Sequence, residues 1–455
     1  MEQVDTVIAT SSGKVRGFTA DGAYVALGVP YAAPPFGANR LRPPLRPERW
    51  DGVRDATKFG PSPPQVAPPQ AAGGGWDTDV AGEDCLNLNI WTPDPGTSGL
   101  PVMVWIQGGQ FEIGATKAYD GSRFARDGVV CVVINWRVGA DGFVYLGHGS
   151  PPGTANLGLL DQVAALEWVQ ENIAAFGGDP ANVTVFGESA GAMSIGMLLS
   201  MPRAEGLFRR AITESGAAHP VTSARSAERI GRELAAKLGV APVLDALAAV
   251  PVERMLAAET DLKADLLAHP DPDRWGEEVL GTMMPWQPVI DGDVIPGPPI
   301  ERVAAGASAD VDLITGTNAD DWRLFRAITG EIGQITDEAL TGPVTTYGSW
   351  ALAAYGLQGQ EALAEYRARY PDASPGELLA DVQTDWWVRI PSIRLADAHA
   401  SAAAAAGTDA GTYMYEFAWP APGLGAVHAL EVPFVFDTLD ANAPLFGPLL
   451  ADANP

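Results

Sequence analysis

Short apolar runs separated by turn residues dominate the first 220 residues of the chain. YVALGVPYA, DCLNLNIWTP, PVMVWI and VVCVVINW are rich in β-branched and aromatic residues and are bounded by Gly, Pro or Asn. Runs of this kind predict β-strands. LGLLDQVAALEWVQENIAAF instead carries apolar residues at helical spacing, and the strand VTVF and the helical AGAMSIGMLLSM follow it. Strands that alternate with helices predict an α/β fold whose mostly parallel sheet is covered on both faces.

The second half of the chain has fewer strand patterns and more helical ones. DVDLITGTN and GTYMYEFAW predict two further strands. Charged helical patterns fill approximately residues 223–280 and 336–406. We therefore expect a single domain over residues 1–455, with these two helical segments as insertions that form a gorge or lid.

The charge balance narrows the classes of partner. Lys and Arg total 29 of the 455 residues, Asp and Glu total 56, and the formal net charge is −27. A chain without a basic face is a poor partner for nucleic acid or anionic membranes. Cys85 and Cys131 form no disulfide framework or metal pattern, so we expect two reduced thiols and a cytoplasmic protein. We expect a monomer or a weak homo-oligomer.

The strongest local motif is VTVFGESAGAMS, in which a strand leads into Gly187-Glu188-Ser189-Ala190-Gly191 and then into a helix. This is the nucleophile-elbow pattern, G-x-S-x-G between a strand and a helix. Such a turn exposes the serine at the end of the sheet, beside a helix N-terminus that favours developing negative charge. Ser189 is therefore the candidate nucleophile.

A nucleophilic serine needs a histidine base, and in this type of site the chain order is serine, acid, histidine. Four of the five histidines follow Ser189, and three of them, His269, His399 and His428, are considered as the base. His399 lies in a helical pattern and His269 precedes the candidate acid. His428 lies in the Gly-rich loop after the strand TYMYEFAW, where a base can reach the elbow. We therefore predict His428 as the base.

The sequence indicates the acid and the oxyanion donors less clearly than the serine and the histidine. DLITGTNADDW offers two adjacent carboxylates, Asp320 and Asp321, and position alone does not choose between them. A carboxylate here would hold the histidine tautomer and stabilise the imidazolium. WIQGGQFEIG follows the strand PVMVWI, and a glycine-rich turn there matches the second half of an oxyanion hole.

Long blocks of this chain resemble the type-B carboxylesterase family, which includes the cholinesterases. They occur in family order and cover nearly the whole chain: LGVPYAAPPFGANRLRPP, EDCLNLNIWTP, PVMVWIQGGQF, INWRVGADGF, NLGLLDQVAALEWVQENIAAFGGDPANVTVFGESAG, GLFRRAITESG, PVIDGDVIP, GTNADDW and VHALEVPFVF. The resemblance implies an α/β-hydrolase that needs no cofactor or metal. The catalytic residues that it implies are Ser189, Asp321 and His428, and the oxyanion-hole donors are Gly109, Gln110 and Ala190.

The chain departs from the family pattern at the site. The family's HGGGF is QGGQF here, with Gln107 and Gln110, and Asp321-Trp322 replaces the family's Glu-Gly. The shorter acid requires a different reach to the histidine. Gln110 crowds the acyl site or adds an amide donor to it.

These patterns together predict a serine hydrolase that cleaves small to medium carboxylic esters through an acyl-enzyme. Two other readings stay open: an amide or carbamate hydrolase on the same triad, and a non-catalytic cholinesterase-like binding protein. Phe111, Trp76 and Trp286 are candidate pocket-wall aromatics, with core packing at least as good an interpretation for Trp286.

Overall fold

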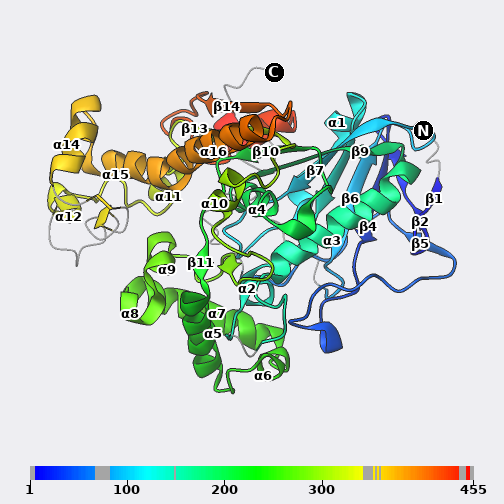
Figure 1. Ribbon diagram of the computed structural model, residues 1–455, viewed down its shortest axis with the longest axis horizontal. Helices are drawn as coiled ribbons and strands as arrows, with labels where there is room; N and C mark the ends of the chain where they lie inside the picture. Colours follow the sequence, from blue (N-terminus) through cyan, green and yellow to red (C-terminus); the bar gives the residue numbers. More distant parts are fainter. Residues whose placement is uncertain are drawn as a thin grey trace.

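A nine-stranded sheet forms the centre of the molecule (Figure 1). The computed structural model describes residues 6–66, 82–147, 150–341, 352–353, 356–357, 360–439 and 447–450. The strand order is β14-β13-β10-β9-β7-β8-β6-β4-β3. The six strands from β14 to β8 are parallel, and β6, β4 and β3 continue the sheet in antiparallel fashion. The strands of this sheet are β3 Phe18–Ala20, β4 Ala23–Pro30, β6 Asn87–Thr92, β7 Leu100–Ile106, β8 Val130–Ile134, β9 Gly178–Glu188, β10 Arg210–Glu214, β13 Asp312–Asn318 and β14 Thr412–Phe417.

Two smaller sheets flank the central one. Strands β1 Val7–Ala9, β2 Lys14–Arg16 and β5 Val53–Asp55 form the first, and β11 Thr222–Ser223 and β12 Val289–Ile290 form the second. The sequence patterns thus located most strands of the main sheet, and a mixed sheet flanked by helices is the arrangement expected of an α/β-hydrolase.

Helices cover both faces of the main sheet, as the strand–helix alternation predicted. Helices α3 and α4 pack on β9, and α1 packs on β6 and β8. The helices are α1 Ser122–Arg126, α2 Gly139–Phe143, α3 Leu157–Asn172, α4 Ala190–Leu198, α5 Ala224–Leu238, α6 Leu244–Ala248, α7 Val252–Ala268, α8 Pro272–Trp275, α9 Glu277–Thr282, α10 Pro299–Ala304, α11 Arg323–Ile328, α12 Asp337–Thr341, α14 Gln360–Arg369, α15 Pro375–Thr384, α16 Ile390–Ala406 and α17 Val432–Val435.

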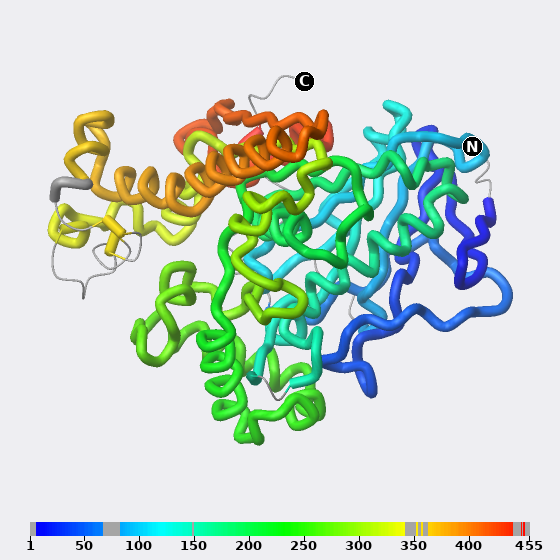
Figure 2. The backbone as a smooth tube through the Cα atoms, in the orientation of Figure 1, coloured from blue at the N-terminus to red at the C-terminus, as the bar shows by residue number. Residues whose placement is uncertain are grey.

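The two helical segments lie at separate ends of the molecule. Helices α5 to α9 gather below the sheet in the view of Figure 1, and α12, α14 and α15 project at its left. A π-helical turn, Asp385–Arg389, joins α15 to α16. Figure 2 shows this long helical stretch running back along the β13–β14 end of the sheet.

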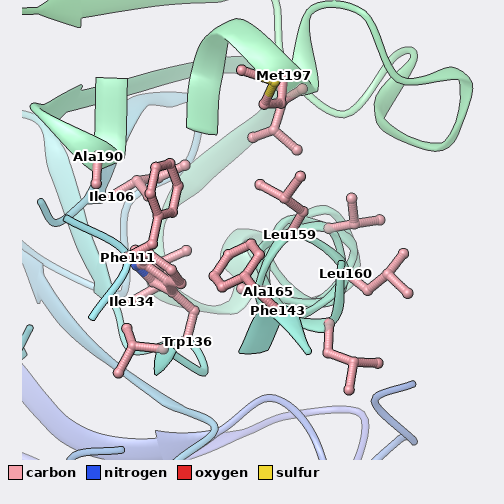
Figure 3. Packing of buried hydrophobic residues seen from close by; sticks show 14 of the residues in the cluster. Ile106, Phe111, Ile134, Trp136, Phe143, Leu159, Leu160, Ala165, Ala190 and Met197 are labelled. Atoms are coloured by element: carbon pink, nitrogen blue, oxygen red, sulfur yellow. The ribbon is translucent and has the colours of Figure 1, made fainter. Parts of the chain in front are cut away.

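The core has two layers, one on each face of the sheet, because side chains alternate along a strand. On β7, Val104 and Ile106 belong to the larger layer, which packs against α3 and α4 (Figure 3). Trp105 points to the opposite face, where its ring packs edge-on against Phe186 (4.8 Å between centroids) and Phe436 (5.0 Å). Both faces of the central strands are therefore buried.

Parallel pairing places the functional loops at one edge of the sheet. Glu214 at the end of β10 is in register with Glu188 at the end of β9 and with Gly316 near the end of β13. The loops that leave these three strands therefore begin side by side. They carry Ser189 and Asp321.

Candidate active site

Ser189 sits in a strained turn between β9 and α4. Its backbone has φ 55° and ψ −123°, a combination that costs a residue with a Cβ about 1–3 kcal/mol and that recurs at functional sites. The two motif glycines let the turn pack closely: a Cβ on Gly187 or Gly191 would overlap the carbonyl oxygen of Ile106 on β7. Helix α4 begins at Ala190, so the serine lies at its N-terminus.

Asp321, not Asp320, contacts the predicted base. Nδ1–H of His428 donates to Oδ1 of Asp321 at 2.7 Å, and both side chains are buried. The other oxygen of Asp321 accepts from the backbone N–H of Asn318 (2.8 Å) and from Oγ of Ser215 (3.1 Å). These bonds fix the carboxylate, so the shorter acid still reaches the histidine.

Asp320 has a different task. Its Oδ2 accepts from the backbone N–H of Ala426 at 2.9 Å, and Oδ1 lies 3.3 Å from Arg323. Asp320 thereby holds the loop that carries His428. The two adjacent carboxylates, which position alone did not separate, point to different partners.

The second ring nitrogen of His428 faces a carboxylate that sequence reasoning missed. Nε2 lies 3.0 Å from Oε1 of Glu188, although not in line for a hydrogen bond. Between these described side chains, the structure has no hydrogen bond from His428 to Oγ of Ser189. Glu188 is the second residue of the G-x-S-x-G motif, and a carboxylate next to the nucleophile was the one available signal.

The neighbouring carboxylates set the charge of the histidine. Burial disfavours the charged ring, but Glu188 and Asp321 outweigh burial and raise the pKa of His428 well above its ordinary value of 6.5. Burial, together with the charges of Glu188 and Asp321, raises the pKa of Glu431 to about 8. Burial and the charges of Glu431 and Glu188 also raise the pKa of Glu214 well above 4.5. The buried carboxyl groups near His428 therefore raise one another's pKa values.

The glycine-rich turn after β7 lies directly against the elbow. A Cβ on Gly108 would lie 2.8 Å from the carbonyl oxygen of Glu188 and 3.0 Å from Cβ of Ser189. Gly109 and Gln110 follow with positive φ angles of 119° and 57°, and the Gln110 side chain is exposed. Within the described residues, the backbone N–H groups of Gly109 and Gln110 have no acceptor. The N–H of Ala190 is at the first position of α4, where helices leave donors free.

The other glutamine of this turn lies beneath it. Gln107 is fully buried, and both atoms of its amide lack hydrogen-bond partners among the described residues. A buried amide without partners is costly. Within the part of the chain that the structure describes, nothing compensates for this departure from the family pattern.

Helix α7 and its neighbours brace the turn from outside. Nζ of Lys263 on α7 lies 2.9 Å from Oε1 of Glu112, and the backbone N–H of Gly139 donates to the carbonyl of Phe111 at 2.7 Å. Oε2 of Glu259, also on α7, accepts from the N–H of Ala140 at 3.2 Å. The inserted helices thus support the loop that faces Ser189.

The expected pocket-wall aromatics need correction. Phe111 is fully buried in the core and packs edge-on against Phe143 (5.2 Å) and Trp136 (6.0 Å; Figure 3). Its side chain is 0% exposed, so the ring is core rather than an open pocket wall. Trp286 also packs in the core, which was the other interpretation of this residue. Trp76 lies outside the described residues.

Different aromatic residues surround the histidine. The ring of Trp322 stacks on Trp387 (4.6 Å, 14°) and lies 6.1 Å from the ring of His428, and Phe325 lies 5.1 Å from it. Trp387 belongs to the π-helical turn, a feature that is frequent at functional sites. A partial signal was visible beforehand, since Trp322 replaces a glycine of the family pattern.

The two other histidines considered as the base, His269 and His399, bond to residues outside this arrangement. His399 on α16 is buried and bonds Oγ1 of Thr412 at 2.7 Å, and exposed His269 pairs with Asp265 at 3.0 Å. Neither contacts the elbow.

Comparisons with family models and with known proteins agree with one another. Residues 4–446 match the model of the carboxylesterase family. The para-nitrobenzyl esterase of Bacillus subtilis (strain 168) is 38% identical over 441 residues, which are 95% of this chain and 83% of that protein. The phenmedipham hydrolase of Pseudarthrobacter oxydans is 35% identical over 95% of this chain and 82% of its own length. The fumonisin B1 esterase of Sphingopyxis macrogoltabida is 35% identical over 97% of this chain and 76% of its own length.

Solved structures of esterases also resemble this structure. A carboxylesterase of Geobacillus stearothermophilus, crystallised at pH 6.2, superposes with a TM-score of 0.80 at 36% identity, covering 95% of this chain and 84% of that one. A PNB esterase structure gives a TM-score of 0.80 at 36% identity, covering 99% and 86%. Among the described residues, no helix is long and apolar enough to cross a membrane.

Proposed function

This chain belongs to the carboxylesterase family, and from that premise we propose that it hydrolyses small to medium carboxylic esters through an acyl-enzyme on Ser189. Oγ of Ser189 attacks the ester carbonyl carbon while Nε2 of His428 accepts the hydroxyl proton. Asp321 holds the imidazole through Nδ1 and stabilises its protonated form. The alcohol leaves with the proton, and a water molecule, activated by the same base, releases the acid.

The observation that carries this proposal is the buried Asp321–His428 pair beside a serine in a strained elbow. For the reaction, Nε2 turns from the Glu188 carboxylate toward the hydroxyl of the adjacent Ser189. The change is local, because Glu188 and Ser189 are consecutive residues. Geometry of this kind tightens when substrate binds.

We assign the oxyanion hole to the backbone N–H groups of Gly109, Gln110 and Ala190. Support comes from the position of Gly108 against Ser189 and from the N–H groups of Gly109 and Gln110, which have no acceptor in the described structure. Donors held in this way stabilise the tetrahedral oxyanion without reorganisation. The proposal needs no cofactor, metal or partner chain.

The location of the enzyme in the cell and the type of bond that it cleaves are also proposals. Buried, free Cys85 and Cys131 support a cytoplasmic location. Matched ester and anilide substrates separate ester cleavage from the amide or carbamate chemistry that the same triad permits. A non-catalytic binding protein would cleave neither.

Replacement of Ser189 by alanine tests the proposal. We expect hydrolysis of p-nitrophenyl butyrate to fall by at least about 1,000-fold, because only binding and the oxyanion donors remain. Ser401→Ala, which changes an exposed serine on α16, is the matched control and should keep nearly full turnover. Full activity in Ser189→Ala would overturn the proposal.

A further inference from the structure

A pocket of about 340 Å³ lies between the segment after β10 and the start of α16. Ala218 and His219 line it from the first segment, and Trp386, Ile390 and Arg394 line it from the second. Most of this lining is apolar or aromatic. The ring of His219 packs edge-on against Trp386, with 5.0 Å between centroids.

The pocket is close to the proposed nucleophile. A Cβ on Gly216 would lie 2.5 Å from the carbonyl oxygen of Ser189, so these two residues are in contact. His219 follows Gly216 by three residues, which limits the distance between their Cα atoms to about 11 Å. On the other side, Trp387 adjoins the pocket and stacks on Trp322, next to His428. His219 therefore lies within about 11 Å of a residue that contacts Ser189, a distance that a substituent of an ester bound at Ser189 can span.

The carboxylate of Asp385 lines the pocket, and its charge is already paired with a cation of the protein. Oδ1 of Asp385 lies 2.7 Å from Arg389, and Oδ2 accepts from the hydroxyl of Tyr366 at 2.8 Å. Arg394, in contrast, has no carboxylate within ion-pair distance in the part of the chain that the structure describes. The pocket thus keeps one uncompensated cation in a protein whose net charge is −27.

A second polar group in the pocket also lacks a partner. Nε2 of His219 is buried and makes no hydrogen bond to any described residue. Burial and the nearby charge of Arg394 lower the pKa of His219 to about 4, so its ring is neutral at neutral pH. A neutral imidazole can still present an N–H to an anion.

We infer that this pocket binds a carboxylate group of the substrate, with Arg394 supplying the charge and Nε2 of His219 a hydrogen bond. The inference rests on the proposed esterase function and adds a substrate class to it: esters that carry a free carboxylate on an apolar stem. Guanidinium matches a carboxylate in both charge and shape. The apolar wall formed by Trp386 and Ile390 suits the stem.

Two pairs of esters, each differing only by carboxylate against carboxamide, test this inference. p-Nitrophenyl monoadipate and p-nitrophenyl adipamate place the group on the acyl side. 4-Carboxyphenyl butyrate and 4-carbamoylphenyl butyrate place it on the alcohol side. The readout is the ratio of kcat/KM for the charged ester to that for the neutral ester, in wild type, Arg394→Gln and Arg394→Lys.

We expect wild type to favour the carboxylate in at least one pair. Arg394→Gln should lower that ratio about fivefold to tenfold, mainly through KM, and Arg394→Lys should restore part of it. Added salt should weaken the preference, because Arg394 is exposed. Arg225→Gln, an exposed arginine on α5, removes the same charge elsewhere and should leave the ratio unchanged.

An unchanged ratio in Arg394→Gln, or a wild-type preference for both neutral esters, would overturn the inference. An equal loss on charged and neutral esters would also overturn it, because that pattern means a structural role for Arg394. Failure of the esterase proposal would give a different result. Wild type and Ser189→Ala would then hydrolyse neutral esters at the same rate, or neither protein would hydrolyse them.

Discussion

At the scale of single residues, His428 occupies a position between two carboxylates. Asp321 bonds Nδ1 at 2.7 Å, and Glu188 faces Nε2 at 3.0 Å. The first contact suits a base because it fixes the tautomer. In the proposed mechanism, the second contact competes with Ser189 for the nitrogen that accepts the proton.

The two adjacent aspartates should differ sharply when changed. Asp321→Asn removes the acceptor of the Nδ1–H bond, and we expect kcat to fall about 10⁴-fold, as loss of a triad acid typically causes. Asp320→Asn keeps one acceptor oxygen for Ala426 and should lower kcat less than tenfold. Steady-state kinetics on p-nitrophenyl butyrate measure both. The assignment of Asp321 is wrong if Asp320→Asn is the more damaged variant.

Glu188 should set the pH dependence of the reaction. A general base works only when unprotonated, so a raised pKa of His428 moves the acid limb of kcat/KM to higher pH than an ordinary histidine gives. Glu188→Gln removes one of the two carboxylates that raise this pKa, and the limb should shift to lower pH. Glu48→Gln, an exposed control, should leave the profile unmoved. A limb unmoved in Glu188→Gln would show that Glu188 does not hold the proton on His428.

At the scale of elements, the elbow is built by close packing between β7, β9 and α4. Gly187 and Gly191 let the backbone pass the carbonyl of Ile106 without a side chain between them. The motif glycines therefore have two effects: they expose Ser189, and they let the helix pack closely on the sheet.

Gly191→Ala tests this packing. The added methyl would overlap the carbonyl of Ile106, and overpacking of this kind costs about 1–3 kcal/mol or more of unfolding free energy. Gly297→Ala is the matched control, because no atom lies within 4 Å of the added Cβ. Urea unfolding of the two variants measures the difference. Equal stabilities would contradict the close-packing explanation of the motif.

At the scale of the whole molecule, local patterns predicted the architecture well. PVMVWI, VTVF and DLITGTN lie on parallel strands of one sheet, as strand–helix alternation predicted. Ser189 was predictable because the elbow is a contiguous motif. His428 followed from chain order, and Asp321 from resemblance to the family.

Contacts between distant segments were not predictable in the same way. No periodicity places Glu188 opposite His428, 240 positions later, or brings His219 to Trp386. Phe111 was expected at a pocket, yet its ring is buried in the core against Phe143 and Trp136. Such outcomes depend on backbone geometry and on packing between elements, which one sequence does not encode locally.

The most direct test of the central claim is to identify the residue that becomes covalently modified. The wild-type protein, treated with a fluorophosphonate, should gain one adduct by intact mass, and peptide mapping should place it on Ser189. Ester hydrolysis should disappear in step with labelling, and Ser189→Ala should remain unlabelled. An adduct on another residue, or full hydrolysis by the fully labelled protein, would contradict the account.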